Sequence, residues 1–436
     1  MVGRLFTFNI LDQLKKYYAL YTNINFNDST SRLTACNVLL FCHDADRGIK
    51  LNGKAYSPLM DSVKEDLERR GLKCLSLAHP FSVLTDEKGY AAPISINRSY
   101  LIHRIATRIL PIRFRSTVFT ELNVYKKIKN KTGAKLLITI GASDDLCEEA
   151  RRLGLFHVEL LHGIGYADLL WGWGNKPAKH LPQGVLSLDH ISTLTFSPLN
   201  RLNISIKTIP HPFLKRFLGE NKNRLPREWT PTSVDKLVYK KEILVTLAWG
   251  YAGDHGQEKE FADILDNGLF YNEIADAINV SQDIFWRFRF HPVQLRKRKY
   301  KYLLAYMDHF ITQHPNTEWR ESSSLPLSTV AMNCSGHISM SSMAAYDVSA
   351  LGVPSLMLCP TIQPGAISEN KFSDLVKEGY VIKANVSKET ILCWVNEVEQ
   401  LPQRLSNLED EAAWECAVKW MLSSSSLDST IKEAVS

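Results

Sequence analysis

The feature that most constrains the fold is an alternation of short apolar runs with amphipathic helical segments along both halves of the chain. The first half holds four apolar runs of strand length, at 37–42, 73–78, 134–140 and 156–161. Between the first two, the spacing predicts a helix over 57–70 that starts at Ser57 and Pro58 and stops at Gly71. Strands that alternate with helices indicate a parallel, doubly wound sheet.

A change of composition divides the chain. The stretch 219–240 is polar, with Pro226 and Pro231 and few apolar residues, so we expect a linker there. After it comes a second series of expected strands, at 243–248, 284–290, 336–340, 354–358 and 380–383. At 436 residues the chain is too long for one ordinary core, so two domains are expected.

We therefore expect an α/β protein with two doubly wound, Rossmann-like domains whose strand ends face a central cleft. Open parallel sheets bind ligands at the carboxyl ends of their strands, so the cleft is the expected site. The expected boundaries are 1–218 for the first domain, 219–240 for the linker, 241–402 for the second domain and 403–436 for a C-terminal helix and Ser-rich tail.

The bulk composition narrows the class of protein. The formal net charge of +6 is mild, and it fits an anionic ligand or membrane surface, or plain scatter in surface charge, better than a dedicated nucleic-acid binder. The eight cysteines form no Cys-x-x-Cys pair, so we expect reduced, structural thiols and a cytoplasmic location. We expect neither a cleaved signal segment nor a membrane-spanning helix, because no stretch approaches eighteen apolar residues.

One strand end in the second half carries a basic and a polar group. The run Arg287 to Phe290 alternates arginine with phenylalanine, and Pro292 stops the strand just after His291. A histidine at the mouth of a sheet can donate a hydrogen bond to a phosphate or protonate it as it leaves. The alternative is a histidine that only caps a turn.

A pair of hydroxyls follows the next strand. Ser341 and Ser342 precede a predicted helix over 343–351, so one of them is expected to be its N-cap. A helix start with free N–H groups and two hydroxyls also suits a phosphate. Pure capping remains the alternative.

A glycine-rich loop follows the first strand of the second domain. In it, Gly253 and Gly256 flank Asp254 and allow close backbone approach to a ligand. Asp254 is therefore a candidate base or nucleophile toward a sugar, or else a simple turn residue.

The first domain offers carboxylates of its own. Glu159 lies inside an apolar strand that ends at His162, and a carboxylate there is costly unless it is paired. Such a group is either salt-bridged or functional, with a raised pKa suited to acid–base work. Asp44 and Asp46 have the spacing of a metal-diphosphate motif, but we expect a solvated turn away from the phosphate site.

Two basic segments, 103–115 and 296–301, could lie against anionic lipid headgroups or could simply be solvated helix faces.

Together these motifs resemble GT-B-fold glycosyltransferases that use CMP-activated acidic sugars. The His291-Pro292 and Ser341-Ser342 pairs are similar to the motifs with which bacterial sialyltransferases hold the CMP phosphate. The Glu159 to Gly163 segment resembles a Glu-x-x-His-Gly segment of the bacterial retaining β-Kdo transferases of surface-polysaccharide synthesis. The sialyltransferase Asp/Glu-Asp/Glu-Gly motif has no clear match, since Asp144-Asp145 is followed by leucine, and this favours the Kdo group.

The resemblance implies a transferase in the cytoplasm or at the periphery of the inner membrane. It would move Kdo from CMP to a surface-glycan acceptor, without a metal or cofactor. It implies donor contacts from His291, Pro292, Arg289, Ser341, Ser342, Gly253 and Gly256, and catalytic roles for Asp254, Glu159 and His162. The alternatives are sialyl transfer from CMP-sialic acid, use of a UDP- or GDP-sugar, or non-catalytic nucleotide or glycan binding. Retention and inversion stay equally open, because they depend on a carboxylate distance that sequence spacing does not fix.

Overall fold

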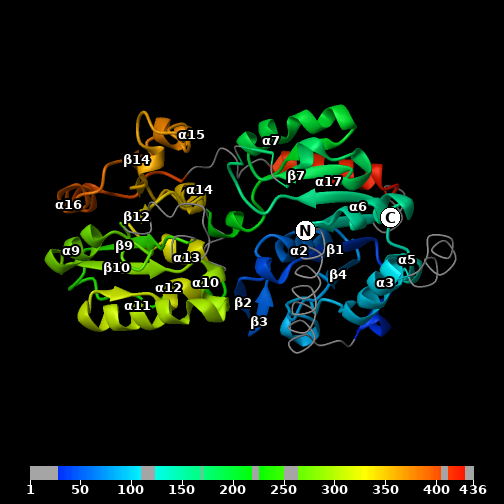
Figure 1. The fold of residues 1–436 in the computed structure, drawn as a ribbon, viewed down its shortest axis with the longest axis horizontal. Coiled ribbons are helices and arrows are strands. Elements are labelled where there is room, and N and C mark those ends of the chain that lie inside the picture. The colour runs from blue at the N-terminus through cyan, green and yellow to red at the C-terminus, as the bar shows by residue number, and fades with distance from the viewer. Residues whose placement is uncertain are drawn as a thin grey trace, which may run out of the picture.

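The computed structural model describes residues 28–109, 123–166, 168–169, 171–218, 225–249, 264–403 and 411–427, without the side chains of 104–109. These residues form two lobes that lie side by side (Figure 1). Each lobe is built on a parallel sheet with six described strands, and a small antiparallel hairpin projects from the first lobe toward the second. The prediction of two doubly wound α/β domains is confirmed.

In both sheets the last strand in sequence lies at one edge. In spatial order, the first sheet consists of β4 (Cys74–Ala78), β1 (Val38–Cys42), β5 (Leu136–Thr139), β6 (Phe156–Leu160), β7 (Gly184–Ser187) and β8 (Ser205–Thr208). The second consists of β11 (Thr317–Glu318), β10 (Ile284–Arg289), β9 (Lys241–Thr246), β12 (Gly336–Ser339), β13 (Ser355–Met357) and β14 (Val381–Lys383). The hairpin pairs β2 (Ile49–Leu51) with β3 (Lys54–Tyr56).

The helices connect these strands. Those of the first lobe are α2 (Met60–Arg69), α3 (Asn97–Ile109), α5 (Val124–Thr132), α6 (Asp144–Arg152), α7 (His190–Phe196) and, from the far end of the chain, α17 (Glu411–Ser424). Those of the second lobe are α9 (Asn272–Val280), α10 (Pro292–Arg296), α11 (Lys301–Gln313), α12 (Arg320–Ser324), α13 (Leu327–Ala331), α14 (Ala344–Ala350), α15 (Ser373–Lys377) and α16 (Lys388–Glu397). Within the described residues, none of these helices has the length and apolar character needed to cross a bilayer.

Both faces of the first sheet are covered, as its near-continuous apolar strands require. Helices α2 and α17 pack on one face, where Leu40 and Ile138 meet Leu67, Trp414 and Met421. Helices α5 and α6 pack on the other. The chain thus returns from the second lobe to complete the first (Figure 1). All eight cysteines are free and six are buried, as expected for structural thiols.

The alternation in β10 is as predicted. Phe288 and Phe290 are buried in the apolar core of the second lobe. Arg287 points to the opposite face, where its guanidinium, 1% exposed, meets Glu242 at 2.5 Å and Glu321 at 3.0 Å. This buried arginine therefore acts as a structural ion-pair centre, while Arg289 at the strand end reaches the space between the lobes.

A shared apolar core joins the two lobes and includes one residue of the segment 219–240, the expected polar linker. Trp229, only 1% exposed, is buried in this core, and its indole N–H donates to the Lys50 carbonyl at 2.5 Å. The buried members come from the hairpin, the segment after β8 and the second lobe: Ile49, Leu51, Tyr56, Phe213, Phe217, Leu218, Trp229, Leu244, Val330, Ala331, Cys334, Val348, Leu351 and Val353. The segment 219–240, which crosses between the lobes, is therefore held in place by the burial of Trp229, despite its polar composition.

Candidate functional site

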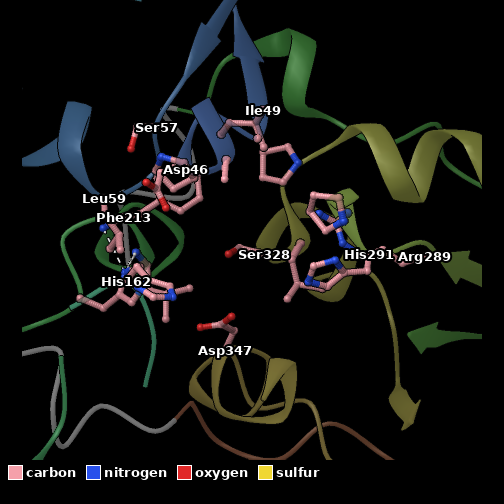
Figure 2. Close-up of a pocket in the computed structure, with 18 residues that line it drawn as sticks. Asp46, Ile49, Ser57, Leu59, His162, Phe213, Arg289, His291, Ser328 and Asp347 are labelled. Atoms are coloured by element: carbon pink, nitrogen blue, oxygen red, sulfur yellow. Dashed lines mark hydrogen bonds between the residues drawn. The ribbon is translucent and has the colours of Figure 1, made fainter. Parts of the chain in front are cut away.

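A cavity of about 390 Å³ lies between the lobes, a size typical of small-molecule sites. Figure 2 shows Asp46 and His162 on one side of it, His291 and Arg289 on the other, and Asp347 beside Ser328. The first lobe contributes Ala45, Asp46, Gly48, Ile49, Ser57, Pro58, Leu59, His162, His211, Phe213 and Leu214, and the second Arg289, His291, Pro292, Pro326, Leu327, Ser328 and Asp347. The carboxyl ends of both sheets meet here, as the sequence predicted.

His291 stands at the end of β10 and also caps the first turn of α10. Its Nδ1 accepts the N–H of Val293 at 3.3 Å, so the neutral ring carries its proton on Nε2. Trp249 stacks on the ring with the two centroids 4.5 Å apart. The ring is open to solvent on one side, but the surrounding cavity walls, then Arg289 and Arg296, lower its pKa to about 4. At neutral pH it is therefore an uncharged N–H donor.

Arg289 and Asp347 line the cavity from the second lobe. One guanidinium nitrogen of Arg289 donates to the carbonyls of Ser322 and, at 2.8 Å, Leu325, and burial lowers its pKa to about 10. Burial raises the pKa of Asp347 to about 7, and the charge of Arg289 opposes that rise. The pair can thus offer a cation together with a carboxyl group that titrates near neutral pH.

The first-lobe wall corrects the expected position of the Asp44–Asp46 motif. Asp46 is not in a turn away from His291 but lines the same cavity, because the loop after β1 lies opposite the loop after β10. Burial raises the pKa of Asp46, which His162 and His43 oppose. Burial lowers the pKa of His162, which Asp46 opposes. Asp46 and His162 therefore line the same cavity, and each opposes the shift that burial imposes on the pKa of the other.

Glu159 lies behind this wall. Only 3% exposed, it accepts hydrogen bonds from the Thr139 hydroxyl and the Gly141 N–H, and from the Ala142 N–H at 3.4 Å. Burial raises its pKa to about 7 against these bonds. It is not among the described residues that line the cavity. Through Gly141, whose carbonyl is 3.1 Å from Nε2 of His43, it shapes the loop beside Asp46.

The two serines lie at the start of α14 but do not occupy the predicted cap position. The helix begins at Ala344 with Met343 as its N-cap residue, and the N–H of Ser342, one position earlier, donates to the Ser339 hydroxyl at 3.3 Å. The Ser342 hydroxyl nevertheless accepts the Ala344 N–H at 3.2 Å. Met343 precedes Asp347 by four positions, so the helix start shares the face that carries Asp347 to the cavity. Neither Ser341 nor Ser342 lines the cavity among the described residues.

The glycine-rich loop with Gly253, Asp254 and Gly256 lies outside the described residues, so its role stays a prediction. Among the described residues, no group of three or more His, Cys, Asp or Glu side chains could hold a metal ion. The basic segment at 103–115 falls largely outside them too. Arg296 to Lys299 are exposed beside the cavity, and Arg296 donates to the Asp44 carbonyl across the cleft at 3.2 Å.

Sequence reasoning missed His211, although a signal existed. The chain holds four His-Pro dipeptides, at 79, 211, 291 and 314. Those at 211 and 291 line the cavity from opposite lobes. The Nδ1 atom of His211 accepts the N–H groups of Phe213 at 3.3 Å and Leu214 at 3.2 Å, and burial lowers its pKa to about 4. His79 differs, because its Nδ1 lies 3.1 Å from the Pro80 carbonyl and so donates to it.

Two Rossmann-like lobes that face each other across a ligand-sized cleft define the GT-B fold. Two solved structures share this arrangement. The S. aureus MnaA–UDP co-structure matches with a TM-score of 0.53 and 11% identity over 90% of this chain and 97% of that one. The wall teichoic acid polymerase TagF matches with a TM-score of 0.51 and 12% identity over 98% and 99%. No protein-family model matches, and no curated protein matches.

Proposed function

We propose that the protein is a glycosyltransferase that binds a nucleotide-sugar donor in the cleft between its lobes. The observation that carries the proposal is the placement of His291, Arg289 and Asp347 opposite Asp46 and His162 around one cavity. A cleft with phosphate-binding groups on one wall and proton-accepting groups on the other suits transfer from a phosphate leaving group to a hydroxyl. The two similar structures, one a co-structure with UDP and one a polymerase, fit this class.

We propose that the donor is a CMP-activated acidic sugar, most specifically CMP-Kdo, and that the acceptor is a bacterial surface glycan. The support is the resemblance of the His-Pro, Ser-Ser and Glu-x-x-His-Gly segments. CMP leaves with a single phosphate, so neutral donors such as His291 Nε2–H can stabilise the departing charge without a divalent metal. Ser341 and Ser342 bind the same phosphate from the start of α14 in this proposal. Lys371, whose ammonium lies 2.8 Å from the Ser341 carbonyl, adds a positive charge nearby.

On the acceptor side, we propose that Asp46 or His162 accepts the proton of the acceptor hydroxyl, because both line the cavity and their pKa values are shifted there. Glu159 then positions the loop through Gly141 rather than touching the acceptor. Asp254 attacks or shields the anomeric carbon, as the resemblance implies. The exposed run from Arg296 to Lys299 beside the cavity supports a peripheral contact with anionic lipid, which vesicle flotation tests.

The test is the substitution His291→Ala, with CMP release measured from CMP-Kdo in the presence of glycan acceptors. We expect turnover to be lost while the circular dichroism spectrum and melting temperature stay near those of the parent. His314→Ala is the matched control, since it removes a His-Pro histidine that is not among the cavity-lining residues. Surviving turnover in His291→Ala would refute the site assignment.

A panel of donors tests the donor class. CMP-sialic acid as the better substrate would favour sialyl transfer. A melting temperature raised by UDP and not by CMP, or turnover abolished by EDTA, would favour a UDP- or GDP-sugar. CMP binding with no turnover on any acceptor would indicate a binding protein.

A further inference from the structure

The geometry of His211 resembles that of His291, although the two residues belong to different lobes. Each histidine precedes a proline and begins a helical turn, and the proline offers no N–H for capping. In each, Nδ1 accepts an N–H from residues two or three positions further on: Val293 for His291, and Phe213 and Leu214 for His211. The turn therefore fixes the ring and leaves its proton on Nε2.

The Nε2 proton of His211 is available to a ligand. Among the described residues, no group accepts a hydrogen bond from it. The ring lines the cavity next to Leu59, Phe213 and Leu214, all of which are buried apolar residues. An uncharged N–H costs less to desolvate than a charged donor, and in an apolar corner its hydrogen bond to an anionic oxygen is stronger than in water.

We propose that His211 is a donor-recognition residue that donates from Nε2 to the carboxylate of the transferred sugar, while His291 donates to the phosphate. This inference rests on the proposed function and extends it to the part of the donor that makes the sugar acidic. An acidic CMP-sugar carries two anionic groups, the phosphate and the carboxylate, both attached to the anomeric carbon. His211 and His291 line the same cavity from different lobes, so each can donate an N–H to one of these groups. Asp46 and Asp347 in the same cavity disfavour an anion that is not held by such donors.

The experiment measures binding of two probes, CMP and a CMP-linked acidic sugar, to the full chain by calorimetry. The acidic-sugar probes are CMP-Kdo and CMP-sialic acid. His211→Ala should lower the affinity for the sugar nucleotide about ten- to a hundredfold, the usual loss for one hydrogen bond to a charged group. It should leave the affinity for CMP unchanged. His291→Ala should weaken both probes, since both contain the phosphate. His314→Ala should change neither.

Two further variants separate recognition from folding. In His211→Asn, the amide oxygen can accept the turn N–H groups and the NH₂ can donate into the cavity, so we expect binding within about fivefold of the parent. In His211→Asp, the carboxylate still caps the turn but cannot donate and repels a carboxylate, so we expect at least the loss seen with alanine. Both should retain the parent melting temperature to within a few degrees.

Two outcomes would overturn the inference in different ways. An equal loss of CMP and sugar-nucleotide affinity in His211→Ala, or full binding by His211→Asp, would show that His211 does not recognise the sugar and would leave the proposed function standing. A parent protein that binds neither CMP nor either CMP-sugar would instead refute the proposed function, and this inference with it.

Discussion

The substitution Glu159→Gln tests whether burial or hydrogen bonding governs the carboxylate behind the cavity. Glu159 is 3% exposed and accepts bonds from Thr139, Gly141 and Ala142. Burial disfavours its charged form and these donors favour it, and the net result is a pKa raised from 4.5 to about 7. Glutamine has nearly the same shape, can accept the Gly141 N–H, and does not titrate.

The magnitude follows from linkage. Between pH 4.5 and 7 the unfolded chain has released the proton of Glu159 while the folded chain still holds it, so unfolding becomes easier as the pH rises. A pKa raised from 4.5 to about 7 corresponds to roughly 3 kcal/mol. This stabilisation is fully present below pH 4.5 and is lost by about pH 8. The Glu159→Gln variant has no titrating group at this position, so its free energy of unfolding lacks this pH dependence.

The assay compares the two proteins by urea denaturation at pH 4.5, 6 and 8. The other titrating groups are shared, so the difference between the two unfolding free energies isolates residue 159. We expect nearly equal stability at pH 4.5, and a variant more stable than the parent by roughly 3 kcal/mol at pH 8. As a control, Glu399→Gln on the exposed surface should leave the difference near zero throughout.

A variant that is less stable than the parent at pH 8 would refute the reasoning. It would mean that the three donors stabilise the ionised carboxylate by more than burial costs. A difference that does not depend on pH would likewise show that Glu159 keeps one protonation state in this range.

Two other substitutions test the shared core and the loop beside Asp46. In denaturant titrations, Trp229→Ala should lower the free energy of unfolding by about 3–5 kcal/mol, the usual loss for a buried tryptophan. Leu237 lies in the same segment but is 97% exposed, so Leu237→Ala should change this free energy by less than about 0.5 kcal/mol. Gly141→Ala puts a Cβ 2.6 Å from the His43 ring at a φ of +78°, so it should destabilise more than Gly154→Ala, which has a φ of +67° and no atom within 4 Å of the added carbon; equal losses in thermal melts would rule out the clash with His43.

The sequence predicted the strands that are buried on both faces, because these give apolar runs such as Val38–Cys42 and Leu136–Thr139. It missed β7, although all four residues of this strand are buried, because Gly184 and Ser187 leave only two apolar residues between them, and it missed β8. Strand β8 lies at the sheet edge, is nowhere fully buried and reads Ser-Ile-Lys-Thr, so it has no apolar run to detect. His211 follows this strand, and its His-Pro dipeptide therefore lacked the strand-end context that drew attention to His291.

Part of the candidate site depends on how the lobes meet, which local sequence does not encode. Strand-end position predicted that His291 and His162 would face a cleft, and both line it. The spacing of Asp44 and Asp46 could not show that this loop meets the loop after β10. Nor could the apolar run around Glu159 show that this residue would lie behind the wall, because its position depends on hydrogen bonds to Thr139 and Gly141, which come from a distant part of the chain.

The return of α17 to the first lobe has a consequence for how the protein is made. Trp414, Val418 and Met421 cover a face of the first sheet, yet they follow the whole second lobe in the chain. During synthesis from the N-terminus, Leu40 and Ile138 can pack against α2 early, but the part of that face under α17 stays uncovered until roughly 280 residues beyond Ile138 have been made. The first lobe to leave the ribosome is thus the last to be completed, and a chain that stops short of residue 411 would leave it open.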